Sequence, residues 1–323
     1  MEKNTTDKNP FIYSDTNKRY HTYDYYLKKK FGVKCIKIPL DCGFTCPNID
    51  GAKGYGGCTY CTAASAVREN LTIGEQYKNA CEILYKKWIS KNENFKIIPY
   101  FQTCTNTYAP LEKLKILYET ALNLPGAAGL NIATRADALG DSTVEYLHEL
   151  SKRTFLTVEL GLQTIHDSTA EKINRLHTFN EFIRGFYKLR GKNINVCVHI
   201  INGLPGENKK MMIQTAEKLS ELHPQGVKIH LLHILKNTVM ADQYLNGGIR
   251  ILTLDEYADI TTDQIRRLPA DIYIGRVTGD GAKSELIAPL WSLKKFTVMN
   301  EIDKKFAALN TYQGEPFDSH KIY

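Results

Sequence analysis

The chain has 323 residues, with 42 basic side chains against 35 acidic ones and a net charge of +7. A hydrophobic fraction of 43% and a charged fraction of 24% are ordinary for a globular protein, and they exclude disordered, collagen-like and coiled-coil chains. No run of about eighteen apolar residues occurs, and residues 1–9 lack the apolar segment of a signal peptide. We therefore expect a cytoplasmic protein that does not cross a membrane.

The N-terminal part of the chain carries much of the basic excess. Residues 1–34 hold eight Lys or Arg and four Asp or Glu, and the run Lys28–Lys30 lies near their end. Such a run fits either a solvated helix face or a surface that contacts phosphates, and the sequence favours neither. We treat residues 1–32 as a basic N-terminal extension.

Strands and helices are predicted to alternate through the central part. Runs rich in β-branched and apolar residues predict six strands, at Val33–Leu40, Lys96–Phe101, Gly129–Thr134, Thr154–Leu160, Ile194–Ile201 and Gly226–Leu232. Apolar residues at three- and four-residue steps predict helices at Gly74–Ser90, Leu111–Leu122, Ser142–Lys152, Phe179–Arg190 and Glu207–Leu222. Alternation gives parallel pairing, in either a doubly wound sheet or a full or partial (β/α) barrel.

The last part of the chain has a different pattern. It predicts a helix at Leu254–Arg267, a strand at Asp271–Arg276 and a further helix near Lys304–Leu309. We expect residues 241–323 to form a C-terminal extension that packs on the α/β unit of residues 33–240.

A cysteine-rich loop follows the first predicted strand. Cys46, Cys58 and Cys61 have the spacing C-x11-C-x2-C, and the loop contains four glycines. Three thiolates leave one coordination position of a metal centre open, whereas a closed zinc site normally uses four protein ligands. Cys42 could supply a fourth ligand, so these residues alone also allow a structural zinc site or buried thiols. In either α/β architecture this loop lies at the carboxyl ends of the strands, where active sites form.

Further motifs give a family resemblance. They are Glu159–Gln163, Asn174–Thr178, Gly203–Glu207, Gly43–Asn48, Tyr100–Gln102, Thr105–Pro110 and Glu285–Ser292. Together with the cysteine loop, they resemble the radical S-adenosylmethionine (SAM) enzymes from about residue 20 to residue 300. Within that superfamily the chain is most similar to the branch of the Elongator catalytic subunit, and to short bacterial proteins without its acetyltransferase domain. The resemblance implies an α/β fold with a partial (β/α)6 TIM-like barrel and N- and C-terminal extensions.

The resemblance also implies the cofactors. Cys46, Cys58 and Cys61 match the ligands of a [4Fe–4S] cluster, whose fourth iron binds SAM. Cleavage of SAM then yields a 5′-deoxyadenosyl radical. Thiolates suit iron–sulfur clusters, so the chemistry of the residues agrees with this assignment.

Six residues are the candidate SAM contacts: Gln102, Thr103, Glu159, Gln163, Arg175 and His199. Gln163 and Arg175 match a family pair that contacts the ribose and the carboxylate of SAM, and an arginine fork suits a carboxylate. Gln102 and Thr103 stand where the family usually has a Gly-rich segment, which this chain lacks. His199 stands where some relatives have a ribose-binding Asp, and a packed core histidine is the alternative.

The candidate catalytic residues lie elsewhere. His230, His233 and Lys236 come at the sixth predicted strand or directly after it, and Arg276 ends the predicted strand of the C-terminal extension. Cations near a barrel mouth suit an anionic substrate, although scattered surface charges are the alternative. We expect these four residues to hold the substrate.

Three functions are compatible with the sequence. The resemblance implies a radical SAM enzyme that acts on tRNA and remodels the C5 side chain of the wobble uridine from carboxymethylaminomethyl toward aminomethyl. It also implies a one-electron donor, flavodoxin or ferredoxin. The alternatives are a radical SAM enzyme for a small anionic metabolite, similar to the coproporphyrinogen oxidases, and a non-catalytic metal-stabilised RNA-binding protein.

Overall fold

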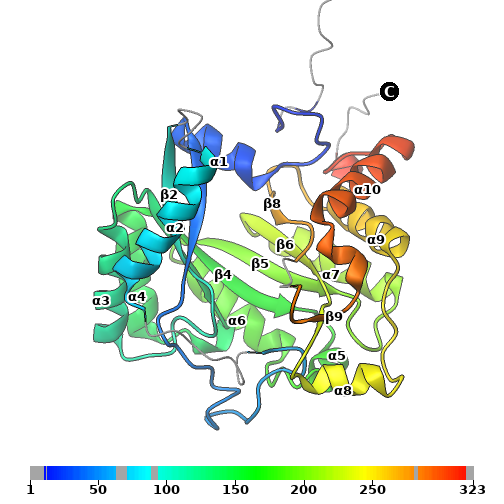
Figure 1. Cartoon of the computed structure of the whole chain (residues 1–323), viewed down its shortest axis with the longest axis horizontal. Helices are drawn as coiled ribbons and strands as arrows, with labels where there is room; N and C mark the ends of the chain where they lie inside the picture. Colours follow the sequence, from blue (N-terminus) through cyan, green and yellow to red (C-terminus); the bar gives the residue numbers. More distant parts are fainter. Residues whose placement is uncertain (1–10, 12, 63–70, 89–93, 280–282, 318–323) are drawn as a thin grey trace, which may run out of the picture.

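Seven parallel strands curl into an open barrel (Figure 1). The computed structural model describes residues 11, 13–62, 71–88, 94–279 and 283–317. The strands are β1 (Lys34–Leu40), β2 (Phe95–Phe101), β3 (Gly129–Thr134), β4 (Phe155–Gln163), β5 (Asn195–Asn202), β6 (Gly226–Leu231) and β8 (Tyr273–Arg276), in that order across the sheet. The expected α/β partial barrel is confirmed, and the expected C-terminal extension supplies its seventh strand.

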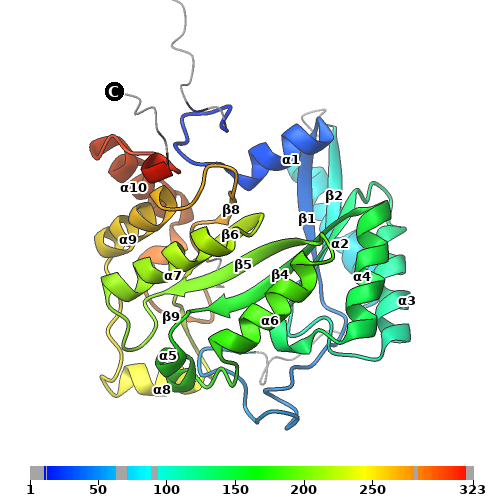
Figure 2. The same cartoon turned by 180° about the vertical axis from the view of Figure 1, so that it is seen from behind.

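Helices cover the outside of the barrel. They are α1 (Tyr23–Phe31), α2 (Ile73–Trp88), α3 (Leu111–Leu122), α4 (Asp141–Arg153), α5 (Asp167–Lys172), α6 (Phe179–Arg190), α7 (Lys209–Leu222), α8 (Val239–Leu245), α9 (Leu254–Arg266) and α10 (Lys295–Ala308). Figure 2 shows α4, α6 and α7 along the outer face of the sheet. A small antiparallel pair, β7 (Ile234–Leu235) and β9 (Leu286–Ala288), lies beside the barrel. No helix in the described part of the chain is long and apolar enough to span a membrane.

The strands separate an apolar outer layer from a polar interior. In β4, Leu156, Val158 and Leu160 are buried in the main hydrophobic core with the covering helices. Glu159 lies between Val158 and Leu160, and Gly161 follows Leu160. Both line a cavity inside the barrel. Successive side chains of a strand point to opposite faces. The alternating residues of β4 therefore supply the apolar outer layer on one face and the polar interior on the other.

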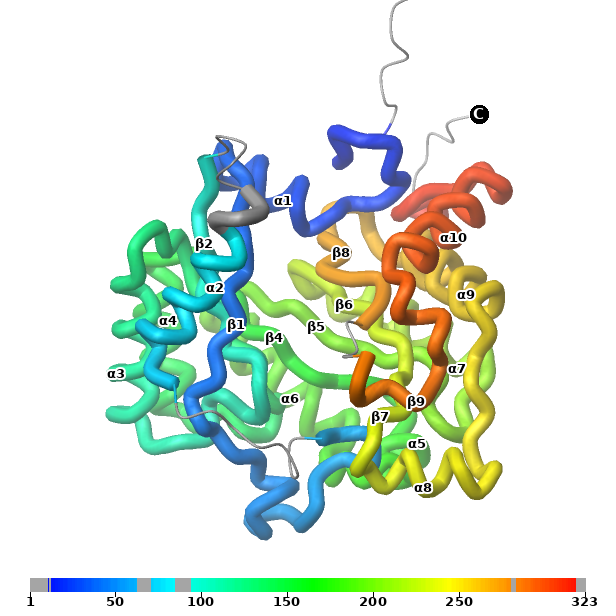
Figure 3. Tube along the Cα trace, viewed as in Figure 1, coloured from blue at the N-terminus to red at the C-terminus, as the bar shows by residue number. Residues whose placement is uncertain are grey.

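The barrel is open between its two edge strands, β1 and β8, and we call this opening the seam. The segment leading into α1 crosses one end of the seam and reaches β8. There the Ile274 N–H donates a hydrogen bond to the His21 carbonyl at 2.7 Å. The Tyr23 ring packs against the Tyr273 ring, with centroids 4.7 Å apart. Figure 3, in the same view as Figure 1, labels β1 on one side of the seam and β8 on the other.

Some elements differ from the sequence expectations. The last long helix, α10, begins at Lys295 and buries Val298, Ile302 and Phe306 at four-residue steps, whereas a helix was expected only near Lys304. The helix α1 was not predicted. It buries a single side chain, that of Leu27, so its sequence shows little apolar periodicity. A nine-residue helix such as α1 depends on tertiary packing rather than on its own pattern.

The close contact between α6 and the turn after β3 leads us to one prediction about stability. A Cβ atom on Gly185 would collide with the backbone carbonyl of Ala136. We expect Gly185→Ala to lower the free energy of unfolding by about 1–3 kcal/mol, as overpacking does. Gly74→Ala is the control: its Cβ atom has room in α2, so stability should stay or rise slightly. Urea unfolding measures both, and equal stability of the two variants would contradict the packing described.

Candidate active site at the cysteine loop

Three cysteine thiols line one cavity at the carboxyl ends of the strands. Cys46, Cys58 and Cys61 border a cavity of about 210 Å³, which we call the cysteine cavity. Their loop follows β1 and lies at the lower end of the barrel in Figure 3, beside α5 and α8. Among the described residues, no three His, Cys, Asp or Glu side chains are grouped so as to bind a single metal ion, whereas the cluster expected from the sequence takes each thiolate on a different iron. Cys42 packs against the hydrophobic core, where burial raises the pKa of its thiol to about 11.

Hydrogen bonds fix the cysteine loop to the segment after α5. The Asn48 side chain donates to the Asn174 carbonyl at 2.6 Å. The Asn174 side chain donates in return to the Gly57 carbonyl at 2.8 Å. The Thr59 N–H donates to the Ile173 carbonyl at 3.0 Å. The two motifs noted in the sequence, separated by more than a hundred positions, therefore form one unit.

Arg175 and Gln163 lie on the wall of the cysteine cavity. The buried Arg175 guanidinium places Nη1 3.8 Å from the Cys58 sulfur, and its Nη2 donates to the Gly161 carbonyl at 2.5 Å. Its Nε has no hydrogen-bond partner within the described part of the chain. Gln163 has a φ of 75°, where the register between β4 and β5 shifts. A bulge of this kind redirects a side chain toward a site.

Arg135 supports this wall, and the sequence analysis did not assign it a role. Its Nη1 and Nη2 donate to the carbonyls of Arg175 and Leu176 at 3.0 and 3.1 Å. Two further hydrogen bonds of 2.9 Å join it to the Asp137 carboxylate. Burial opposes ionisation of Asp137, but the hydrogen bonds and charge of Arg135 hold the pKa of the carboxyl below its usual range. In the sequence, the only indication of a role for Arg135 and Asp137 was their position after the third predicted strand.

The residues after β2 are placed less specifically. Gln102 and Cys104 line the cysteine cavity, and the half-buried Thr103 lies between them. Cys104 has a φ of 63°, so the backbone turns sharply there. Contact of Gln102 and Thr103 with SAM stays a prediction.

Glu159 is the centre of a charged network inside the barrel. Its carboxylate accepts hydrogen bonds from Lys37 at 2.8 Å, from Tyr100 at 2.6 Å and from Lys228. Asn131 donates to it as well, at 2.8 Å. Burial alone would raise the pKa of the carboxyl, but Lys228 and Lys37 hold it well below the usual range. The carboxylate is thus ionised and lines the cysteine cavity.

Two histidines lie beside this network. His199 Nε2 is 2.8 Å from the Glu159 carboxylate, and the rings of His199 and His230 are 5.1 Å apart. Burial and the charge of Lys228 lower the pKa of His199 to about 4. Burial, His199 and Arg276 hold the pKa of His230 well below its usual range. Both imidazoles are therefore neutral at pH 7. His199 lines the cysteine cavity, as a SAM contact would require, but it is hydrogen-bonded to Glu159.

The other candidate catalytic residues are dispersed. Arg276 is paired in register with Lys228, which is paired with His199, so these three lie side by side on β8, β6 and β5. The His233 ring packs against Gly279. Lys236 is exposed after β7. The structure thus brings His230 and Arg276 to the charged interior and leaves Lys236 outside it.

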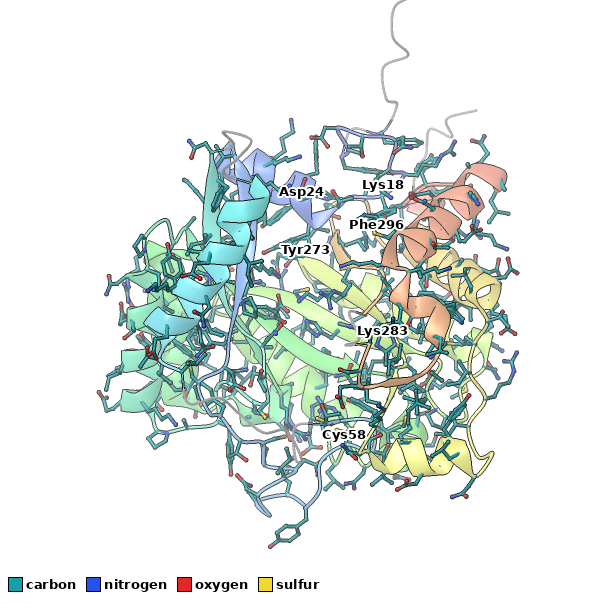
Figure 4. All side chains as sticks on the ribbon, viewed as in Figure 1. Lys18, Asp24, Cys58, Tyr273, Lys283 and Phe296 are labelled. Carbon is teal, nitrogen blue, oxygen red and sulfur yellow. The ribbon has the colours of Figure 1, made fainter. Side chains whose placement is uncertain are left out.

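The basic run Lys28–Lys30 lies at the other end of the barrel. It belongs to α1, which precedes β1, whereas the cysteine loop follows β1. Figure 4 shows this separation through Asp24 of α1 and Cys58. The seven residues of β1 span about 20 Å. The run and the mouth of the cysteine cavity are therefore not one continuous surface.

Comparison with known proteins gives the family. Residues 54–219 match the radical SAM superfamily, and residues 224–308 match the radical SAM C-terminal domain. The protein YtqA of Bacillus subtilis is 45% identical over 313 residues, which cover 96% of each chain. A tRNA uridine(34) acetyltransferase of Methanocaldococcus jannaschii is 25% identical over 173 residues, 53% of this chain and 31% of the relative. The structure of Elp3 from Methanocaldococcus infernus superposes with a TM-score of 0.64 at 15% identity, covering 86% of this chain and 64% of Elp3.

The chain belongs to the radical SAM superfamily and is a radical SAM enzyme with a [4Fe–4S] cluster and SAM as cofactors. Its residues fit these groups. Three thiols border one cavity, and the Asn48 amide and the Arg175 guanidinium both lie 3.8 Å from the Cys58 sulfur, where donors favour a thiolate. The Arg175 Nε, which has no hydrogen-bond partner among the residues that the structure describes, offers a further donor at the cavity wall.

The protein's own residues hold and surround the cofactors. When bound, the cluster and SAM supply one-electron radical chemistry. Cys46, Cys58 and Cys61 are the predicted iron ligands, and Arg175 and Gln163 the predicted SAM contacts. The neutral His199 and the ionised Glu159 form the side of the cavity that faces the barrel interior.

The position of the thiols makes a prediction about the cluster. Cys58→Ala should remove both the cluster and SAM cleavage, because it deletes a thiol of the cavity. Cys42→Ala should leave both, because that thiol packs in the core. Iron content of anaerobically prepared protein and 5′-deoxyadenosine formation measure the two effects. Equal iron loss in both variants would overturn the ligand assignment.

A second prediction concerns the guanidinium on the cavity wall. Arg175→Ala should weaken SAM binding by about 1.5–3 kcal/mol, the value of a charge-assisted hydrogen bond, while the cluster content survives. Arg184→Ala, at an exposed position of α6, is the matched control and should bind SAM normally. Equilibrium dialysis with labelled SAM measures the affinity. Wild-type affinity in Arg175→Ala would exclude this role.

A third prediction tests the interior network. Glu159→Gln leaves the buried Lys228 and the half-buried Lys37 without a carboxylate, so the free energy of unfolding at pH 7 should fall by about 3–5 kcal/mol. Glu149→Gln removes an exposed pair with Lys152 and should cost less than about 1 kcal/mol. Urea unfolding compares them. A cost as small as that of the surface control would show that Glu159 does not neutralise the interior.

Proposed function

We propose that this radical SAM enzyme acts on tRNA and converts a carboxymethylaminomethyl group at C5 of the wobble uridine toward aminomethyl. The likeness to a tRNA uridine(34) acetyltransferase, together with the Elp3-like fold, is the observation that carries this proposal. The name of the first relative refers to one nucleotide of tRNA, uridine 34, and the second likeness concerns the fold. A one-electron donor, flavodoxin or ferredoxin, reduces the cluster.

The charges inside the barrel support an anionic side chain as the target. Lys37 and Lys228 face one carboxylate, that of Glu159, and Arg276 lies beside Lys228. Two ammonium groups that face one carboxylate leave a positive charge around Glu159, which borders the cysteine cavity. A carboxymethyl group carries one negative charge and suits such surroundings.

Access to the base requires that it leave its stack. A wobble uridine lies in a single-stranded loop, where extruding a base costs little. The lysine run of α1 is about 20 Å from the cysteine loop, so in this proposal it contacts phosphates outside the anticodon loop rather than the modified base.

A small anionic metabolite is the second candidate substrate. The same positive interior favours it, because a carboxylate of any small molecule would meet the same lysines.

The test is mass spectrometry of tRNA nucleosides from cells with and without this gene. We predict that deletion makes carboxymethylaminomethyluridine accumulate and removes aminomethyluridine and its derivatives. The wild-type gene should restore the pattern, and a gene encoding Cys58→Ala should not. Wobble-uridine nucleosides that do not change on deletion would refute the tRNA proposal and favour the small metabolite.

A further inference from the structure

The Cys58 sulfur receives hydrogen bonds from two side chains that come from different parts of the chain. Asn48 Nδ2 and Arg175 Nη1 each donate to it over 3.8 Å. Cys58 is buried, whereas Cys46 and Cys61 are half-buried. Figure 4 labels Cys58 at the lower end of the barrel. The two donors thus meet at the most enclosed of the three predicted ligands.

Asn48 is fully buried, and its neighbours fix the orientation of its amide. Its backbone carbonyl accepts from the Gly57 N–H at 2.8 Å, and its Nδ2 also donates to the Asn174 carbonyl at 2.6 Å. Its Oδ1 faces Gly54, where a Cβ atom would lie 3.0 Å away. A flipped amide would place Oδ1 against the Asn174 carbonyl oxygen, so the nitrogen is held toward Cys58.

The Asn48 amide does more than tie two segments together. Its Oδ1 is buried and has no hydrogen-bond partner among the residues that the structure describes. A buried acceptor without a partner lowers stability, and such a group in a native protein calls for an explanation. The bonds Asn174–Gly57 and Thr59–Ile173 join the same two segments. What distinguishes the Asn48 amide from them is its contact with the Cys58 sulfur.

A hydrogen bond to a ligand sulfur changes the reduction potential of an iron–sulfur centre. One-electron reduction adds one negative charge, which comes from a one-electron donor that is itself oxidised, and no bond forms or breaks. An N–H group that points at the thiolate stabilises the more negative, reduced state and so raises the potential. Burial strengthens this effect, because little water screens the sulfur.

We propose that Asn48 is a positioning residue that raises the reduction potential of the [4Fe–4S] cluster through the Cys58 sulfur. Arg175 donates to the same sulfur, but it is also the predicted contact of SAM. Asn48 has no predicted contact with SAM, so its effect on the potential is present before SAM binds. This role goes beyond the proposed function and does not depend on the RNA substrate.

The experiment is a redox titration of the anaerobically reconstituted protein without SAM, followed by electron paramagnetic resonance of the reduced cluster. Asn48→Ala removes the donor, so the potential should fall. At a fixed potential, the ratio of reduced to oxidised cluster should be about three- to tenfold lower than in the wild type, as expected for one hydrogen bond. A tenfold change corresponds to about 59 mV for one electron. Asn48→Leu is the second variant, because its branched side chain has the shape of asparagine and lacks the donor.

The matched control is Asn174→Ala. It removes the reciprocal hydrogen bond to the Gly57 carbonyl and places alanine at a φ of 50°, so it disturbs the same junction at least as strongly. It removes no donor to a thiol, and its reduction potential should equal that of the wild type. Iron content, measured in all four proteins, reports how far each substitution disturbs cluster assembly.

A second readout tests the hydrogen bond itself. Electron–nuclear double resonance of the reduced cluster, recorded in H2O and in D2O, detects exchangeable protons close to the ligand sulfurs. Wild-type and Asn174→Ala proteins should show an exchangeable coupling that Asn48→Leu lacks. Identical spectra of the three proteins would exclude the bond.

Three results of the titration would overturn the proposal. The first is a wild-type potential in both Asn48 variants, and the second is an equal fall in Asn174→Ala, which would assign the change to the loop. The third is loss of the cluster from both Asn48 variants, which would make Asn48 a residue of loop assembly. The tRNA nucleosides of the deletion strain do not enter this test, so the proposed function and the role of Asn48 can fail separately.

Discussion

The carboxylate of Glu159 is the interaction on which the interior of this barrel depends. A buried charge is tolerated only when it is paired and hydrogen-bonded, and Glu159 meets partners from five other strands. They are Lys37, Tyr100, Asn131, His199 and Lys228. The contacts tie β1 to β6 from the inside, while the apolar outer layer ties the same strands to the helices. The Glu159 position of β4 therefore sets both the charge and the shape of the barrel interior at the cysteine cavity.

The active site divides into a cofactor side and an interior side. The cofactor side consists of loops whose conformation is unusual: Gln163, Asn174 and Leu176 all have positive φ, and the cysteine loop is hydrogen-bonded to them or to their neighbours. Sparsely populated backbone conformations of this kind persist where surrounding contacts enforce them, typically at active sites. The interior side is rigid sheet, and its side chains carry the excess positive charge. Glu159 belongs to both sides.

Much of this arrangement could be predicted from the sequence, because it follows local patterns. Each of the six expected strands is present within a few residues, and the thiol spacing located the cysteine loop. The lysines of the interior could not be predicted. In a short strand such as β1, Lys34 and Lys37 look alike, and only the pairing with Glu159, 122 positions away, shows which one is inside. Arg135 was missed for the same reason, since the carbonyls that it supports, those of Arg175 and Leu176, belong to a distant loop.

The most direct measurement of the central claim, that the cysteine cavity holds the cluster and SAM together, is electron paramagnetic resonance of the anaerobically reduced protein with and without SAM. The account predicts a reduced [4Fe–4S] signal that changes when SAM is added, together with formation of 5′-deoxyadenosine. A cluster signal that SAM leaves unchanged, without 5′-deoxyadenosine, would contradict it.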